Sequence, residues 1–174
     1  MGYRFFMTRI LIDGYNLLAV SGHKNRDHLI EAFRKYQQAK GHQITVIFDG
    51  THGGTGSGDR YFESSVEVIF SPLTVTADDM IEKMLSSSEA SGTIVVSSDR
   101  RIQSAAKRVG STYVESKEFA RKLLNTLISS SSSEVPIWLE GRLEETDNRI
   151  KTRKGASKKL SKEERQRRRK LNRL

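Results

Sequence analysis

Short apolar runs alternate with amphipathic segments along the first 128 residues of the chain. The runs are rich in β-branched residues and bounded by polar residues or glycine, which is typical of buried parallel strands. The predicted strands are about residues 8–13, 43–49, 66–70, 93–98 and 112–115. Apolar residues at helical spacing predict helices at about residues 26–40, 77–89, 100–109 and 116–128. This alternation predicts an α/β domain with a mainly parallel central sheet.

Two changes in composition divide the chain. Residues 50–60 contain five glycines and predict a mobile loop, and five consecutive serines at 129–133 predict a hinge. We therefore expect a domain at 1–128, a hinge with a small appendage at 129–150, and a basic tail at 151–174. Within the tail, a capping-box spacing predicts a short helix after residue 161 that forms on binding.

The basic charge of the chain is concentrated in that tail. Residues 151–174 contain twelve Lys or Arg and two Glu, a net charge of +10, whereas the remainder carries −1. Such a segment is typical of proteins that bind nucleic acid. The tail residues predicted to contact RNA are Lys158, Lys159, Arg165, Arg167, Arg168, Arg169 and Lys170.

The composition also excludes several classes of protein. The chain has no cysteine, so it has neither a disulfide framework nor a zinc–thiolate site, which fits a reducing cytoplasm. Arg4, Arg9 and Asp13 interrupt the first apolar stretch, so we expect no signal peptide and no membrane span.

Aspartates follow several of the predicted strands. Asp13, Asp49 and Asp99 end or directly follow strands, and Asp78 opens a predicted helix with Glu82 one turn later. Ligands bind beyond the carboxyl ends of the strands in parallel sheets, so these carboxylates would meet at one edge. Like charges repel, and a divalent metal ion is the simplest reason to gather them.

Each aspartate also has an ordinary structural explanation. Asp13 and Asp49 precede glycine and suit turns, while Asp78 and Asp99 suit the first turn or cap of a helix. Other phosphate-binding patterns do not fit, because the glycine-rich stretch ends in Asp59-Arg60 rather than in the lysine of a P-loop. The joint placement of the acids favours the functional interpretation.

The segments IDGYN, FDG, TADDMIEKM and VVSSDRR, in this order, resemble the YacP-type NYN domains, a branch of the PIN-like nucleases. The resemblance covers residues 9–128. It implies a PIN-like three-layer α/β/α sandwich and a metal-dependent endoribonuclease, similar to ribosome-associated enzymes that cleave bacterial mRNA. It also implies an acidic catalytic site composed of Asp13, Asn16, Asp78 and Asp99, with Asp49 and Glu82 as further candidate metal ligands.

The predicted function is therefore cleavage of RNA with Mg²⁺ or Mn²⁺, since hard oxygen ligands suit these ions. Asp13, Asp78 and Asp99 would hold the metal, Asn16 would position the phosphate, and Arg60, Arg100 and Arg101 would contact the RNA backbone. Two alternatives remain open. One is an RNA- or ribosome-binding module without turnover, and the other is a small-molecule phosphohydrolase, which would not need the tail.

Overall fold

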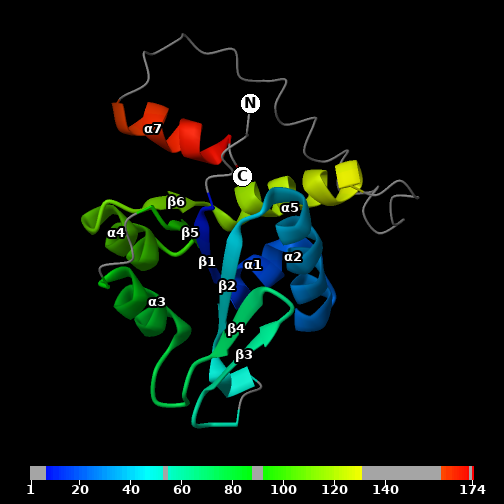
Figure 1. The fold of residues 1–174 in the computed structure, drawn as a ribbon. Coiled ribbons are helices and arrows are strands. Elements are labelled where there is room, and N and C mark those ends of the chain that lie inside the picture. The colour runs from blue at the N-terminus through cyan, green and yellow to red at the C-terminus, as the bar shows by residue number, and fades with distance from the viewer. Residues whose placement is uncertain (1–6, 53–54, 88–91, 131–161, 173) are drawn as a thin grey trace.

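A computed structural model describes residues 7–52, 55–87, 92–130, 162–172 and 174, and its centre is a six-stranded sheet in the order β3-β4-β2-β1-β5-β6 (Figure 1). The strands are β1 (Arg9–Asp13), β2 (Gln43–Phe48), β3 (Asp59–Glu63), β4 (Val66–Phe70), β5 (Ile94–Val96) and β6 (Thr112–Val114). Only β3 and β4 pair antiparallel, and the other neighbours are parallel. The predicted mainly parallel sheet is confirmed.

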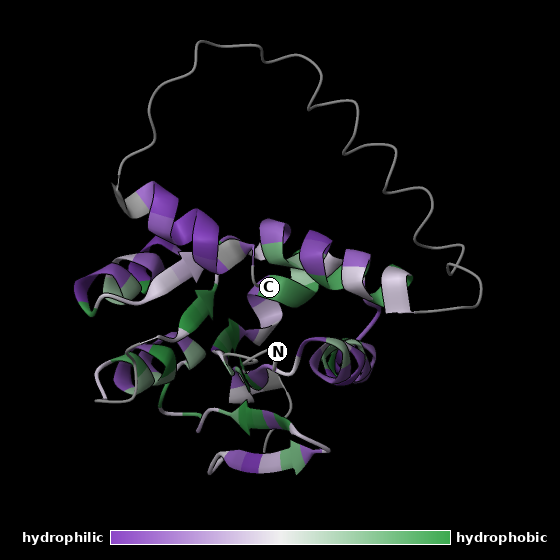
Figure 2. Ribbon diagram, turned by 45° about the horizontal axis from the view of Figure 1, so that its top comes forward, coloured by the Kyte–Doolittle hydropathy of each residue, from purple (hydrophilic) through white to green (hydrophobic). Residues whose placement is uncertain are grey.

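Helices cover both faces of this sheet. They are α1 (Gly14–Ser21), α2 (Arg26–Lys40), α3 (Ala77–Leu85), α4 (Arg100–Arg108), α5 (Ser116–Ser130) and α7 (Lys162–Leu171), with a 3₁₀ turn η1 at Gly50–His52. One apolar cluster packs the sheet against α1, α2 and α5, and a second packs the other face against α3 and α4. Figure 2 shows the hydrophobic strands between these helical layers.

The alternation of side chains along β1 explains why this strand lies at the centre. Ile10 and Ile12 belong to the first apolar cluster and Leu11 belongs to the second. All three side chains are buried. A strand that is apolar on both faces needs cover on both faces, which the two helical layers provide.

Two elements differ from the sequence-based expectation. Residues 14–21 form α1, although the sequence analysis predicted no helix between the first strand and residue 26. Residues 59–63 form the edge strand β3, although the stretch 50–60 was predicted to be a loop. The β3 sequence DRYFE is largely exposed and has only β4 as a neighbour, so its strand conformation comes from pairing and not from an apolar pattern. The helix predicted at 77–89 ends at Leu85.

In the basic tail, residues 162–171 form the helix α7, which packs on β6 (Figure 1). Arg167 Nε donates a hydrogen bond to the carbonyl of Tyr113 at 3.3 Å, and its guanidinium lies 4.7 Å from the Tyr113 ring centroid. Leu174 is buried in the first apolar cluster, and its carbonyl accepts a 2.6 Å hydrogen bond from Tyr36 Oη. These contacts explain why the segment folds onto the domain.

Several predictions fall outside the described residues. The appendage at 134–150 and the candidate RNA contacts Lys158 and Lys159 lie there. Ser129 and Ser130 of the predicted hinge continue α5, with hydroxyls that bond to carbonyls one turn earlier. Among the described helices, none has the length and apolar character needed to cross a membrane.

Candidate acidic site at the carboxyl edge of the sheet

The candidate site lies where the strand order reverses. From β1 the chain proceeds to β2 and β4 on one side, then crosses to β5 and β6 on the other. Asp13 is the last residue of β1, and Ser97 and Asp99 follow β5, the neighbouring strand. In open parallel sheets such a switch point opens a crevice at the carboxyl ends of the strands.

Asp13 is buried at this point, with 7% of its surface exposed. One carboxylate oxygen accepts a hydrogen bond from Asn16 N at 3.2 Å, which caps α1, and the other accepts one from Ser97 Oγ at 3.0 Å. The next residue must be small, because a Cβ on Gly14 would lie 2.5 Å from the Phe48 ring. Gly14 therefore allows α1 to start directly against the end of β2.

Asn16 ties three elements of the site together. Its Oδ1 accepts hydrogen bonds from Ser98 N at 3.1 Å and from Ser116 Oγ at 2.5 Å. Asn16 thus joins α1 to the loop after β5 and to the start of α5. In this arrangement its carbonyl oxygen holds the backbone that carries Asp99, whereas the sequence predicted that Asn16 would position a phosphate.

Asp99 caps α4 and is linked to Asp13 through Ser97. Its Oδ1 accepts a 2.6 Å hydrogen bond from Arg101 N. The fully buried Ser97 hydroxyl accepts a 3.0 Å hydrogen bond from Asp99 N while it donates to Asp13. From the sequence, the hydroxyls of Ser97 and Ser98 were candidates for holding phosphate, and the link that Ser97 makes between the two aspartates was not predicted.

The third carboxylate, Asp78, lies close enough to act on Asp13 through its charge. Burial, followed by the charges of Asp78 and Asp99, raises the pKa of Asp13 to about 6, against the lowering effect of its hydrogen bonds. Burial, followed by the charge of Asp99, also raises the pKa of Asp78. The charges of Asp78 and Asp99 therefore both reach Asp13, and the charge of Asp99 reaches Asp78.

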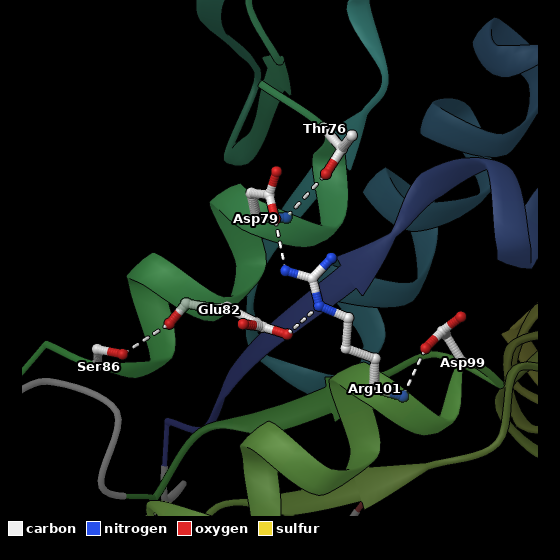
Figure 3. A network of polar contacts seen from close by, with 6 residues as sticks. All are labelled: Thr76, Asp79, Glu82, Ser86, Asp99 and Arg101. Atoms are coloured by element: carbon white, nitrogen blue, oxygen red, sulfur yellow. Dashed lines mark hydrogen bonds and ion pairs between the residues drawn. The ribbon is translucent and has the colours of Figure 1, made fainter. Parts of the chain in front are cut away.

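Arg101 forms a bridge beside these acids (Figure 3). Its guanidinium contacts Asp79 Oδ1 at 2.6 Å and Glu82 Oε1 at 2.7 Å, which joins α4 to α3. The hydrogen bond from Arg101 lowers the pKa of Asp79. Glu82 was a predicted metal ligand and Arg101 a predicted RNA contact, but the structure pairs these two side chains with each other.

The remaining predicted residues occupy other positions. Asp49 Oδ1 accepts hydrogen bonds from Thr51 N at 3.0 Å and Thr51 Oγ1 at 2.7 Å, and so holds the η1 turn. Arg60 lies on the edge strand β3 and forms an ion pair with the buried Glu67. Arg100 is exposed in the first turn of α4.

The donor chemistry of the three aspartates fits a hard divalent ion, because carboxylate oxygens are the ligands that Mg²⁺ and Mn²⁺ prefer. The pKa values of Asp13 and Asp78 are raised by burial and, to a smaller extent, by neighbouring carboxylates, a repulsion that a cation would relieve. Within the part of the chain that the structure describes, however, no three His, Cys, Asp or Glu side chains form a ready-made metal cage. The carboxylates of Asp13 and Asp99 instead cap helices.

The fold and this acidic edge define a nuclease-like α/β domain with an RNA-related role. The chain belongs to the YacP-like NYN domain family, whose model matches residues 10–173. The chain resembles the crystal structure of Rae1 (YacP) from Bacillus subtilis, with 27% identity and a TM-score of 0.56 over 83% of this chain and 82% of that one. A mutant of the same protein matches with 27% identity and a TM-score of 0.53 over 86% and 87%. No curated protein matches the chain.

The raised pKa of Asp13 predicts a pH dependence of stability without metal. Because the folded state holds this proton up to about pH 6 and the unfolded state releases it near 3.8, ionisation of Asp13 costs stability as pH rises between these values. Asn does not ionise, so we expect Asp13→Asn to remove up to about 3 kcal/mol of the fall in the free energy of unfolding between pH 4 and pH 7.5. Denaturant unfolding in EDTA at these two pH values measures this free energy.

Asp59→Asn provides a control of opposite sign. Hydrogen bonds from Thr55 lower the pKa of Asp59, so its charged form stabilises the fold above pH 4 and this contribution disappears as the pH falls. Asp59→Asn should therefore be relatively less stable at pH 7.5 than at acidic pH. If the stability of Asp13→Asn and Asp59→Asn changed with pH in the same direction relative to the parent, the opposite pKa shifts of the two aspartates would be contradicted.

Proposed function

We propose that this protein is a cytoplasmic endoribonuclease that uses Mg²⁺ or Mn²⁺ to cleave RNA phosphodiester bonds, with ribosome-associated mRNA as its substrate. The proposal rests on one observation above all: at the switch point of a YacP-like NYN domain, the charges of Asp78 and Asp99 add to burial in raising the pKa of Asp13, and the charge of Asp99 adds to burial in raising that of Asp78. The similarity to Rae1 (YacP) supports it.

In this proposal, Asp13, Asp78 and Asp99 would hold the ion. A divalent metal bound there would supply an activated water and neutralise charge on the reacting phosphate. The chain itself keeps the site in place. Ser97 holds Asp13 and the backbone of Asp99 together, while Asn16 fixes the loop after β5.

Helix orientation would contribute to phosphate binding. The helices α1, α4 and α5 each follow the carboxyl end of a parallel strand, directly or after a short loop, and therefore start at the same edge of the sheet as Asp13. Helix N-termini present free N–H groups and partial positive charge, which favour an anionic phosphate. This would offset part of the repulsion between RNA and the three carboxylates.

Cleavage of labelled RNA tests the proposal. Free mRNA and translated mRNA are incubated with the purified protein and Mn²⁺, Mg²⁺ or EDTA, and the RNA ends are mapped. We expect internal cuts that require metal. Cuts confined to translated mRNA would support the ribosome as partner, and hydrolysis of a generic phosphate ester in place of RNA would favour a phosphohydrolase.

A second candidate is an RNA- or ribosome-binding module without turnover. The observation that favours it is the pairing of Arg101 with Asp79 and Glu82, which neutralises acids next to Asp78. A module of this kind would bind RNA equally well with and without metal and leave it intact. Metal-dependent cuts that disappear in Asp99→Asn would exclude it.

The exposed side of α7 predicts a salt effect on RNA binding. Arg165, Arg168 and Arg169 are exposed, whereas Arg167 is half-buried against Tyr113. If each exposed arginine neutralises one phosphate, changing all three to Gln should flatten the slope of log affinity against log salt by about 2 units. Filter binding between low and moderate salt measures this slope. An unchanged slope would assign the RNA contact to another surface.

A further inference from the structure

A groove of about 490 Å³ lies between the start of α2 and the β3–β4 hairpin. Its lining includes Arg26 and Asp27 of α2, Tyr61 of β3 and Phe70 of β4. Phe70 ends β4, so the groove opens at the same edge of the sheet as Asp13. Because only β2 separates β4 from β1, the two places are about 10 Å apart across the sheet.

Aromatic rings connect the groove with the acidic site. Tyr15 of α1 packs edge-on against Phe48 at 5.2 Å between ring centroids, and Phe48 stacks on Phe70 at 5.5 Å. Tyr61 lies nearly parallel to Phe70 at 6.4 Å, and the Arg26 guanidinium is 5.1 Å from the Phe70 centroid. Phe48 and Phe70 are buried, so these rings do not contact a ligand themselves but hold Tyr61 at a fixed position relative to the acidic site.

Tyr61 is the exposed member of the row. Its exposed fraction is 41%, although Phe70 is buried, so one end of the aromatic row is open to a ligand. Single-stranded RNA is recognised by unstacked bases that pack on aromatic rings and arginine planes. The groove offers both kinds of surface.

The charged side chains that line the groove differ in whether they are already bonded within the protein. Asp59 is held by hydrogen bonds from Thr55 N at 2.8 Å and Thr55 Oγ1 at 2.7 Å, and Arg60 is held by Glu67. Among the described residues, no hydrogen bond or ion pair occupies the carboxylate of Asp27. An ionised carboxylate only accepts hydrogen bonds, through two oxygens. On its Watson–Crick edge, guanine alone of the four RNA bases presents two adjacent N–H donors.

We propose that this groove binds one unstacked guanine of the RNA substrate, with the base on Tyr61 and its N–H edge on Asp27. The proposal rests on the proposed RNA substrate, but it does not require cleavage. It assigns to the β3–β4 hairpin the choice of sequence next to the acidic site. Neither Tyr61 nor Asp27 was singled out from the sequence.

Binding in EDTA tests the groove separately from catalysis. The probe is a labelled single-stranded RNA hexamer with one guanine, and fluorescence anisotropy gives its affinity. We expect Tyr61→Leu, which keeps apolar bulk without the ring, to weaken binding by about 5- to 150-fold. The matched control is Phe62→Leu, because Phe62 is the next residue of the strand, is 66% exposed and does not line the groove. This control should bind like the parent.

Hypoxanthine tests the base. It lacks the exocyclic amino group of guanine, so the parent protein should bind the inosine-containing hexamer about 5-fold or more weakly, a loss typical of one hydrogen bond to a charged acceptor. In Asp27→Ala, this difference should disappear.

Three results separate the possibilities. Equal affinities for the parent and a folded Tyr61→Leu variant would overturn the groove as a base site. A Tyr61 effect without discrimination between guanine and hypoxanthine would overturn the choice of guanine. If Tyr61→Leu weakens binding and the parent discriminates guanine from hypoxanthine, but the protein never cleaves RNA, the groove would be supported and the proposed nuclease refuted.

Discussion

Replacing Asp13 by asparagine is expected to abolish metal-dependent RNA cleavage while leaving the domain folded. Asparagine keeps the shape of the side chain and can still accept the hydrogen bond from Asn16 N, but it lacks the charge that a divalent ion needs. Asp78→Asn and Asp99→Asn should act in the same way. We expect each cleavage rate to fall by about 1,000-fold, the order of loss found when a catalytic group is removed.

Two measurements accompany the rate. Glu31→Gln on α2 is the matched control, because it also removes one negative charge, from a surface ion pair with Arg34, and should cleave normally. Denaturant unfolding in EDTA should show that Asp13→Asn is at least as stable as the parent near neutral pH. Full activity in any one of the three variants would remove that residue from the site.

The same assay decides the roles of the other acids. Asp49→Asn should retain most activity if the residue only holds Thr51, as its hydrogen bonds indicate. Glu82→Gln breaks one contact of Arg101 and should have an intermediate effect, since it alters the charge next to Asp78. A loss in either variant as large as that in Asp13→Asn would place that acid among the metal ligands.

Replacing Gly50 by alanine should destabilise the fold by about 3 kcal/mol or more. A Cβ at this position would lie 1.9 Å from the carbonyl oxygen of Ser71, a backbone atom that cannot move away independently. Gly50 N also donates a 3.1 Å hydrogen bond to Ser71 Oγ, and Ser71 is fully buried. Any shift that relieves the clash disturbs the ends of β2 and β4. Denaturant unfolding of the purified variant measures the loss.

Gly110→Ala is the control for this prediction. Gly110 has a φ of +71°, but a Cβ there would meet nothing within 4 Å. The variant therefore isolates the cost of the left-handed backbone, about 1 to 2 kcal/mol. If Gly50→Ala were no more destabilising than Gly110→Ala, the close contact with Ser71 would not be limiting.

The sequence determined the central part of the fold and the position of Asp13 and Asp99 at one edge of the sheet. The alternation of Ile10, Leu11 and Ile12 predicts a strand buried on both faces, and the structure places this strand in the middle of the sheet. The aspartates after strands could be recognised because the carboxyl ends of parallel strands always meet at one edge. These features are local, so a single segment of the chain is enough to show them.

Only the tertiary structure decided which charges neutralise each other. Arg101 and Glu82 are predicted to serve RNA and metal when considered separately, but the packing of α4 beside α3 brings them into contact at 2.7 Å. Leu174 belongs to the basic tail, whose composition predicts little packing against the domain, yet its side chain lies in the apolar core and its main-chain oxygen bonds to Tyr36. Such pairings join residues far apart in the sequence, and no local pattern encodes them.

The β3–β4 hairpin is a second feature that local sequence patterns did not predict. Its first strand has polar and aromatic residues in a glycine-rich context, so the sequence predicted a loop and assigned no role to Tyr61. Pairing with β4 satisfies the backbone of this segment and places the Tyr61 ring beside Phe70. An edge strand derives its conformation from the hydrogen bonds of its neighbour, so the groove exists only once the sheet has formed.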